Sequence, residues 1–409
     1  MKYIPRLLEN ILNKYLKIFP VTAITGPRQS GKSTFVKHHL GSKYQYVTFD
    51  DPLLIDFFYS DPRGFMKQYN NHIIFDKVQK VPEIFSYLKI EVDKDRDKFG
   101  KYVLTGSSQF HLLKHISESL AGRIGLLSLL PFQYGEIPET LREKQILYGS
   151  YPELVTRNYE YVFEWFASYL STYIERDVGN LFNIGNLRDF QKLIQLLVAL
   201  CAQELNMSQL SRELGVTVKT IQSWISVLEA SYIIFLLPSY HKNLGKRIIK
   251  RPKLYFYDTG LICYLTGVTN TNILERGPLS GSIFKNYIVS EIKKAQHHLN
   301  KNENLYYFRS SSGLEVDLII ENLPEKKVSY IEIKNNSTVK YKMIESIKKI
   351  MELDLETPEG MGGKTGKKYL KIRQQGYLLY RGNETAKFTD SISYINYREF
   401  FRDYPQSQT

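Results

Sequence analysis

The sequence has few cysteines and no long hydrophobic run. Its 409 residues include only Cys201 and Cys263, too few for a disulfide framework or a cysteine metal cage, so we expect buried thiols in a reducing compartment. No window approaches the roughly 18 apolar residues that a membrane-spanning helix needs. The N-terminal segment is interrupted by charges and lacks the apolar core of a signal peptide. We therefore expect a cytoplasmic protein without a membrane partner.

Acidic residues are also in deficit, with 42 Asp and Glu against 55 Lys and Arg, a formal net charge of +13. A positive field favours polyanionic partners such as nucleic acid, nucleotides or a membrane surface. A solvated basic face explains the same excess, so charge alone leaves nucleic-acid contact open. The length predicts two or three domains rather than one core.

The first part of the chain, about 135 residues, alternates short apolar runs with helical stretches. This pattern is typical of a parallel sheet covered by helices. We expect a helix at 32–40 and strands at 21–25, 44–50, 72–76, 101–107 and 124–130.

A glycine-rich segment follows the first predicted strand and fits G-x-x-x-x-G-K-[ST] at every position. Its glycines allow the backbone to wrap phosphates, and the N–H groups at the helix start point at the anion. The motif predicts binding of a nucleoside triphosphate, most simply ATP with Mg²⁺. Lys32 is expected to reach the β- and γ-phosphates, and Ser33 to ligate the metal. The expected nucleotide-binding residues are Gly26, Pro27, Arg28, Gln29, Ser30, Gly31, Lys32, Ser33 and Thr34.

Two further strands end in polar residues that suit a nucleotide site. Asp76 ends the run HIIFD and is expected to hold the metal through water, although a capping role fits the same position. The fourth strand ends in Thr105-Gly106-Ser107-Ser108, where Ser107 or Ser108 is expected to sense the γ-phosphate. Capping of the next helix is the alternative for these serines.

The middle of the chain reads as a winged helix-turn-helix over roughly 206–258. Two helices at 208–214 and 217–228 flank Gly215, and a basic turn at 241–253 joins two predicted strands. The second helix would present polar residues to base edges and the turn would neutralise phosphates. Because that helix is not strongly basic, a protein-interaction role stays open. The basic residues expected to neutralise phosphates are Lys242, Lys246, Arg247, Lys250 and Arg251.

The chain resembles bacterial AAA-type ATPases of undefined function fused to a C-terminal domain of PD-(D/E)XK nuclease type (the DUF4143 type). The resemblance spans nearly the whole chain, and membership says little about biological role. The stretches that carry it are TGPRQSGKST, VQKVPEIFSYLK, VLTGSSQF, SLAGRIGLLSLLPFQYGE, YIERDV, YFYDTGL, EVDLII and YIEIK.

This chain departs from the family pattern directly after Asp76. The family has a glutamate there that polarises the attacking water, whereas this chain has Lys77. General-base assistance is typically worth about 10²–10⁴ in rate, so we expect slow or absent hydrolysis. Gln79 as a water-orienting residue, or Asp51 or Glu83 as a replacement carboxylate, are the alternatives.

Arg123 in SLAGR is a candidate arginine finger that would reach a neighbouring protomer's γ-phosphate. That role implies a homo-oligomer. A structural ion pair within the chain is the alternative.

The C-terminal region contains the elements of a D…E-x-K site. Asp317 lies in one predicted strand, and Glu332 and Lys334 share a face of the next. Two carboxylates would bind a divalent metal and the lysine would steady the attacking hydroxide. The resemblance implies a glutamate after Phe284, where this chain has Lys285, which cannot ligate metal while protonated. A binding or structural role is therefore favoured over cleavage.

Together these observations predict an α/β protein with three parts: a P-loop parallel-sheet domain at 1–140, a helical and winged-helix connector at 141–275, and a restriction-endonuclease-like domain at 276–409. We expect ATP with Mg²⁺ to act as a conformational ligand, with slow or partner-dependent hydrolysis and contact with DNA. An ATP-regulated, metal-dependent DNA nuclease and a non-enzymatic DNA-binding switch are the alternatives.

Overall fold

The computed structural model describes residues 3–106, 119–173, 187–240, 251–301, 304–355 and 373–404. The chain divides into two compact units, each assembled from discontinuous segments. The N-terminal unit comprises Met1–Phe190, Gln222–Ile234 and Lys293–Asn300; the C-terminal unit comprises Gln191–Ile221, Phe235–Ile292 and Lys301–Thr409. The predicted three-part division stays a prediction.

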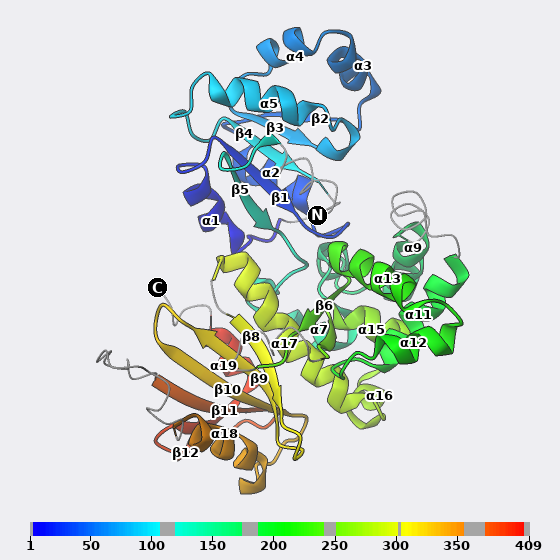
Figure 1. Ribbon diagram of the computed structural model, residues 1–409, viewed down its shortest axis with the longest axis vertical. Helices are drawn as coiled ribbons and strands as arrows, with labels where there is room; N and C mark the ends of the chain where they lie inside the picture. Colours follow the sequence, from blue (N-terminus) through cyan, green and yellow to red (C-terminus); the bar gives the residue numbers. More distant parts are fainter. Residues whose placement is uncertain are drawn as a thin grey trace, which may run out of the picture. The chain divides into compact units, whose positions relative to one another are not determined.

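The N-terminal unit contains a five-stranded sheet in the order β2-β3-β4-β1-β5, with every neighbouring pair parallel (Figure 1). Each strand falls inside a range that the sequence predicts. The strands are β1 (Val21–Thr25), β2 (Gln45–Thr48), β3 (Ile73–Asp76), β4 (Tyr102–Thr105) and β5 (Ile124–Ser128).

The strands of this sheet are buried on both sides, because helices cover both of its faces. Ala23 packs into one hydrophobic cluster with residues of α3, α4 and α5, whereas its neighbour Ile24 packs into a second with residues of α1 and α2. Successive strand residues point to opposite faces, so two adjacent apolar residues supply both cores. The helices are α1 (Leu8–Tyr15), α2 (Lys32–Leu40), α3 (Pro52–Ser60), α4 (Pro62–Gln68) and α5 (Ile84–Asp93).

The middle of the chain is mostly helical. Gly215 ends α12 in the left-handed region at φ 68°, and the Thr217 hydroxyl accepts from Thr220 N at 3.1 Å at the start of α13. The predicted helix, turn and helix are therefore present, followed by a two-stranded sheet of β6 and β7. Residues 241–250 of the predicted basic turn lie outside the described residues. The elements are α7 (Gln145–Tyr148), α8 (Pro152–Thr156), α9 (Val162–Tyr173), α11 (Leu187–Ala199), α12 (Met207–Leu214), α13 (Val218–Ala230), β6 (Ile234–Leu237) and β7 (Lys253–Phe256).

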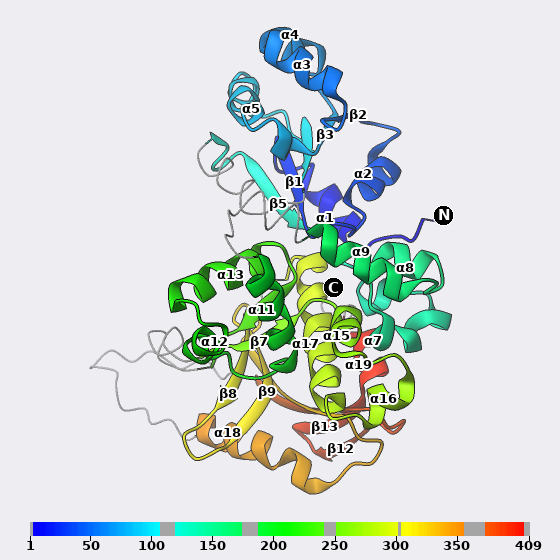
Figure 2. The same cartoon turned by 90° about the vertical axis from the view of Figure 1, so that its right-hand side faces the viewer.

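The C-terminal unit contains a six-stranded mixed sheet in the order β12-β13-β11-β10-β9-β8, with α18 against one face (Figure 2). Strands β10, β11 and β13 are parallel, and their register aligns Lys334, Tyr380 and Asn396 at one edge. The elements are α15 (Thr259–Thr266), α16 (Thr271–Arg276), α17 (Ser280–Leu299), β8 (Asn304–Arg309), β9 (Glu315–Asn322), β10 (Lys327–Lys334), α18 (Glu345–Leu355), β11 (Arg373–Tyr380), β12 (Ala386–Thr389), β13 (Ile392–Asn396) and α19 (Tyr397–Asp403).

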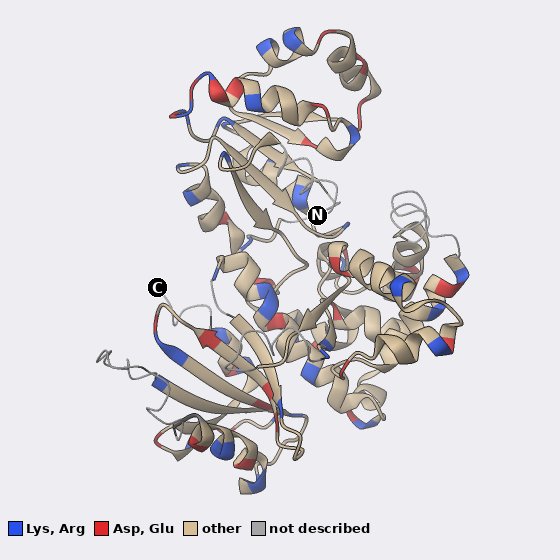
Figure 3. Ribbon diagram, in the orientation of Figure 1, with Lys and Arg blue, Asp and Glu red and all other residues tan. Residues whose placement is uncertain are grey.

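Basic and acidic segments are interspersed in both units (Figure 3). In the described part of the chain, no helix is both long and apolar enough to cross a membrane.

Candidate functional site

The P-loop joins β1 to α2 and depends on its two glycines. Gly26 adopts φ 143° and Gly31 φ 87°, values that side-chain-bearing residues rarely adopt. A Cβ on Gly26 would lie 2.1 Å from the carbonyl oxygen of Leu129. The loop therefore requires glycine at position 26 for space as well as for backbone conformation.

Lys32 lies inside the loop that it would use to bind phosphate. Its Nζ donates to the carbonyl oxygens of Gly26 at 2.9 Å and Pro27 at 2.6 Å, and the residue is buried. The ammonium group is thus held at the centre of the cradle formed by the loop backbone. These residues fit a triphosphate: Lys32 and the α2 N-terminus would contact its phosphates, and Ser33 would contact a Mg²⁺ ion that neutralises them.

A buried ion pair that the sequence analysis missed anchors the P-loop backbone. Arg6 donates to the Ser30 carbonyl oxygen at 3.0 Å and pairs with Glu136 at 3.0 Å. Burial raises the pKa of Glu136, but the charge of Arg6 and the interaction with His298 outweigh it and hold that pKa well below its ordinary value. Glu136 also accepts from the backbone N–H of Leu7 at 2.8 Å. The N-terminal segment is thereby tied to the phosphate loop.

Asp76 ends β3 in an environment that keeps its carboxylate ionised. It accepts hydrogen bonds from the Tyr46 and Thr105 hydroxyls and from Lys77 N at 2.9 Å. Burial raises the pKa of Asp76, but the hydrogen bonds from Thr105 and Tyr46 help to hold it below its ordinary value. An ionised carboxylate that also interacts with Ser33 suits a water-mediated metal contact.

Strand β4 lies between β3, which ends in Asp76, and β1, which leads into the P-loop. Its register pairs Thr105 with Asp76 on β3 and with Ile24 on β1. A polar residue at this strand end therefore does lie next to Asp76, and Thr105 is the one described. Ser107 and Ser108, the predicted γ-phosphate sensors, lie outside the described residues, so that role stays a prediction.

The P-loop opens onto a cavity of about 700 Å³ with several basic residues. Lys77 adopts a left-handed conformation at φ 62° and lines it, as do Gln79 and Lys80. Among the described residues, two carboxylates line it, and both are in ion pairs. Asp50 lies 2.6 Å from Lys80, and Glu153 lies 2.9 Å from Arg157.

The replacement carboxylates considered from the sequence do not line this cavity. Asp51 instead caps α3 by accepting from Leu53 N at 2.9 Å, and Glu83 accepts from the Tyr59 hydroxyl at 2.8 Å.

Helices α8 and α9 supply residues that the sequence analysis missed. Trp165 donates to Glu153 at 3.1 Å and lines the cavity with it.

Arg123 forms an ion pair with Asp93 of the same chain, at 2.7 Å and 3.1 Å. This geometry corresponds to the structural alternative stated above. The arginine-finger role stays a prediction.

The C-terminal carboxylates meet as the strand pattern predicts, but lysines compensate them. Lys285 Nζ lies 2.5 Å from Asp317 Oδ1, and Lys334 Nζ lies 2.6 Å from Glu332 Oε1. The other Asp317 oxygen accepts from Ile333 N at 3.0 Å. Both Asp317 oxygens are therefore in contact with groups of this chain, Oδ1 with Lys285 and Oδ2 with the Ile333 N–H. Within the described residues, no group of three or more His, Cys, Asp or Glu is arranged to hold a metal ion.

The two carboxylates have opposite pKa shifts. Burial raises the pKa of Asp317, but the charges of Lys285 and Lys253 outweigh it and hold that pKa below its ordinary value. Burial and the neighbouring Asp317 raise the pKa of Glu332 to about 7, despite its ion pair with Lys334. The site therefore contains one firmly ionised carboxylate and one that titrates near neutrality.

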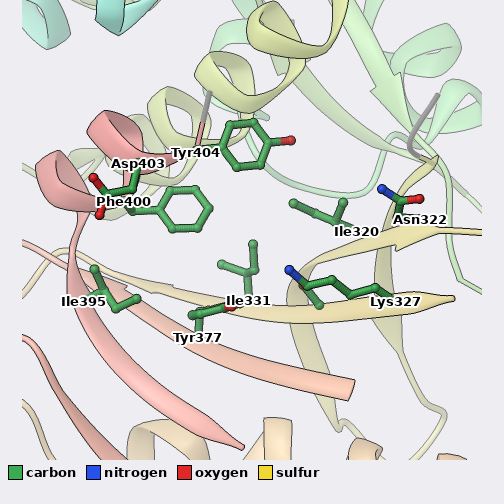
Figure 4. Close-up of a pocket in the computed structure, with 10 residues that line it drawn as sticks. Ile320, Asn322, Lys327, Ile331, Tyr377, Ile395, Phe400, Asp403 and Tyr404 are labelled. Carbon is green, nitrogen blue, oxygen red and sulfur yellow. The ribbon is translucent and has the colours of Figure 1, made fainter. Parts of the chain in front are cut away.

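A second cavity in the C-terminal unit, of about 200 Å³, lies between the sheet and α19. Phe400 of α19 and Tyr404, which follows that helix, face Ile331, Tyr377 and Ile395 of the strands (Figure 4). This largely apolar lining does not bring catalytic groups together.

Three family models match successive parts of the chain. Residues 19–138 match an AAA domain, 139–272 a domain of unknown function (DUF8612), and 280–400 a domain of unknown function (DUF4143). The chain therefore carries an AAA-type ATPase domain followed by a C-terminal domain of the DUF4143 group.

Similar proteins include an uncharacterized protein of Mycobacterium tuberculosis, 29% identical over 329 residues that cover 80% of this chain and 73% of its own. An uncharacterized protein of Methanocaldococcus jannaschii is 24% identical over 377 residues, covering 83% and 81%. Among solved structures, the Walker-type ATPase of Pyrococcus abyssi is 16% identical over 63% of this chain and 94% of its own, with a TM-score of 0.39. The ADP form of the Aeropyrum pernix ORC2 protein is 15% identical over 57% and 89%, with a TM-score of 0.30.

Proposed function

We propose that this protein binds ATP with Mg²⁺ at the P-loop and retains it with slow or partner-dependent hydrolysis, so that the nucleotide acts mainly as a conformational ligand. The observation that carries this proposal is the pairing of a complete phosphate-binding loop with Lys77 next to the ionised Asp76. Binding requires the loop, Lys32 and Ser33; rapid hydrolysis also requires a base.

The surroundings of the cavity support slow turnover. Lys77 follows the metal aspartate directly, and a charged ammonium cannot take a proton from water. Asp50 and Glu153, the carboxylates that line the cavity within the described part of the chain, are each within 3 Å of a basic partner. A cationic lining attracts the triphosphate but does not activate a nucleophile.

The test combines nucleotide binding with turnover on the full chain. We expect calorimetry to show ATP binding that needs Mg²⁺ for full affinity, and Lys32→Ala to weaken it about ten- to a hundredfold, the range for charge-assisted hydrogen bonds. Lys17→Ala, which changes an exposed lysine outside the loop, is the matched control. Equal affinity in the parent and Lys32→Ala would refute the proposed site.

We also propose that the protein contacts DNA. Two surfaces are candidates for this contact: the winged-helix region with its basic turn, and the C-terminal unit. For the turn, we expect salt-dependent DNA binding that weakens when Lys246 and Arg247 are both changed to alanine. For the nuclease alternative, cleavage lost on Asp317→Ala would be required. The Lys285–Asp317 ion pair favours binding over cleavage, because an ammonium group occupies the metal-facing oxygen.

A further inference from the structure

The C-terminal unit contains a cleft at the carboxyl ends of its parallel strands β10, β11 and β13. Asn335 follows β10, Arg381 follows β11, and Arg398 comes two residues after the end of β13. In open α/β sheets, ligands bind in the crevice outside the carboxyl ends of parallel strands. The cleft therefore lies where this architecture places a ligand.

The cleft consists of two adjoining cavities, of about 400 and 730 Å³, which share Glu275 and Asn335 in their linings. Of the residues that the structure describes, seven basic side chains line the two cavities against three carboxylates, Glu204, Glu275 and Glu315. Asp317 and Glu332 are buried next to these cavities and do not line them. When these two carboxylates are included, the basic groups still outnumber the acidic ones, by seven to five. The basic residues are Lys253, Lys285, Arg309 and Lys334 in the larger cavity, and Arg276, Arg381 and Arg398 in the smaller.

The arginine part of the cleft suits phosphate recognition. Arg276 and Arg398 are exposed, and Arg381 packs over the Phe284 ring at 5.1 Å while its guanidinium lies 2.7 Å from Glu275. The Glu275 side chain is about half exposed, so this is a solvent-screened ion pair that an incoming anion can displace. Planar guanidinium groups bind phosphate oxygens in a bidentate manner.

The lysines of the larger cavity compensate the buried carboxylates, so a metal ion is not needed to neutralise them. Lys285 and Lys334 neutralise Asp317 and Glu332 at 2.5 and 2.6 Å, so the carboxylates are compensated from within the chain. A phosphate that enters this cavity would meet the ammonium groups of Lys285 and Lys334 rather than uncompensated carboxylates.

From this arrangement we propose that the cleft binds the sugar-phosphate backbone of DNA without a divalent metal. The proposal deepens the DNA-binding part of the proposed function, and it is independent of the nucleotide site. ATP calorimetry tests the nucleotide site and DNA anisotropy without nucleotide tests the cleft, so failure of one is distinguishable from failure of the other.

The test is fluorescence anisotropy of a labelled DNA duplex with the full chain, in EDTA and without nucleotide, over a series of salt concentrations. Arg276→Glu combined with Arg398→Glu is expected to weaken binding about tenfold or more. The slope of log affinity against log salt is expected to fall by about one for each lost phosphate contact. Both residues are exposed, so the double variant should fold.

The control is Lys349→Glu combined with Lys387→Glu, which makes the same charge change at exposed positions outside the cleft. An equal loss in both double variants would overturn the proposal in favour of a diffuse charge effect. Binding that is unchanged in the cleft variant but lost when Lys246 and Arg247 are alanine would overturn it in favour of the basic turn. DNA binding abolished by EDTA would also contradict it.

A second variant tests directly whether Lys285 keeps metal ions from binding at Asp317 and Glu332. Lys285→Glu would place a third carboxylate beside Asp317 and Glu332, and oxygen donors of this kind suit Mn²⁺. We expect titration with Mn²⁺, followed by electron paramagnetic resonance, to show a bound ion in the protein with both Asp76→Ala and Lys285→Glu but not in the Asp76→Ala protein that retains Lys285. Mn²⁺ bound at Asp317 in the presence of Lys285 would refute the metal-free site.

Discussion

The Lys285 ammonium, on helix α17, lies 2.5 Å from the Asp317 carboxylate, on strand β9 of the C-terminal unit. Asp317 is almost fully buried, and its backbone partner Ile333 N occupies the other oxygen. Among the cations near Asp317, which include Lys253 and Lys334, Lys285 has the largest effect on its ionisation, so we expect the local stability to depend on Lys285.

Removing Lys285 is expected to destabilise the C-terminal unit. Lys285→Ala leaves Asp317 buried without its closest cation, a change that typically costs about 3–5 kcal/mol. Chemical denaturation at neutral pH measures the loss, and Lys285→Arg is the charge-retaining control. Because the pKa of Asp317 is lowered by folding, the stability it contributes is present above its unfolded value and is lost as the pH falls through the folded value. The difference between parent and Lys285→Ala should therefore shrink in acid.

Glu332 is expected to produce the opposite pH dependence. Folding raises its pKa from 4.5 to about 7, so its contribution to stability is fully present below pH 4.5 and is lost as the pH rises through 7. Glu332→Gln should flatten the stability profile across this window. Denaturation midpoints for the parent and the variant at pH 5 and pH 8 provide the test, and parallel profiles would contradict the assignment.

Gly26→Ala is expected to abolish ATP binding. The added Cβ would lie 2.1 Å from Leu129 O, and alanine tolerates φ 143° poorly. Gly281→Ala is the control, because a Cβ there meets nothing within 4 Å. Calorimetric titration with ATP distinguishes the two, and unchanged affinity in Gly26→Ala would show that the loop tolerates a side chain.

Breaking the Arg6–Glu136 pair is expected to affect both stability and nucleotide affinity. Arg6→Ala leaves Glu136 buried without its closest cation, a change that typically costs about 3–5 kcal/mol, and it removes the hydrogen bond to Ser30 O. Arg142→Ala removes a partly exposed guanidinium and is the control. Loss of stability without weaker ATP binding would show that the anchor does not shape the loop.

Local sequence patterns were sufficient for the elements of the site. The run from 21 to 40 predicted β1 and α2 with their observed bounds, because a buried strand, a glycine loop and a helix start leave strong local signals. Asp76 was identified in the same way, from an apolar run that ends in a carboxylate.

The partners that surround these residues could not be predicted, because they come from distant segments. Tyr46 reaches Asp76 from another strand, and Glu153 reaches the nucleotide cavity from α8; neither position carries a local pattern. The ion pair between Lys285 and Asp317 likewise depends on how α17 packs on β9. Such contacts are consequences of tertiary packing, which residue spacing does not encode.

The measurement that tests the central claim most directly is single-turnover ATP hydrolysis by the parent, Lys77→Glu and Lys32→Ala proteins with Mg²⁺. The account predicts ATP bound by the parent with little hydrolysis, and a rate about 10²-fold or more higher in Lys77→Glu, where a carboxylate can accept a proton. Rapid turnover by the parent that disappears in Lys32→Ala and is not increased by Lys77→Glu would contradict it.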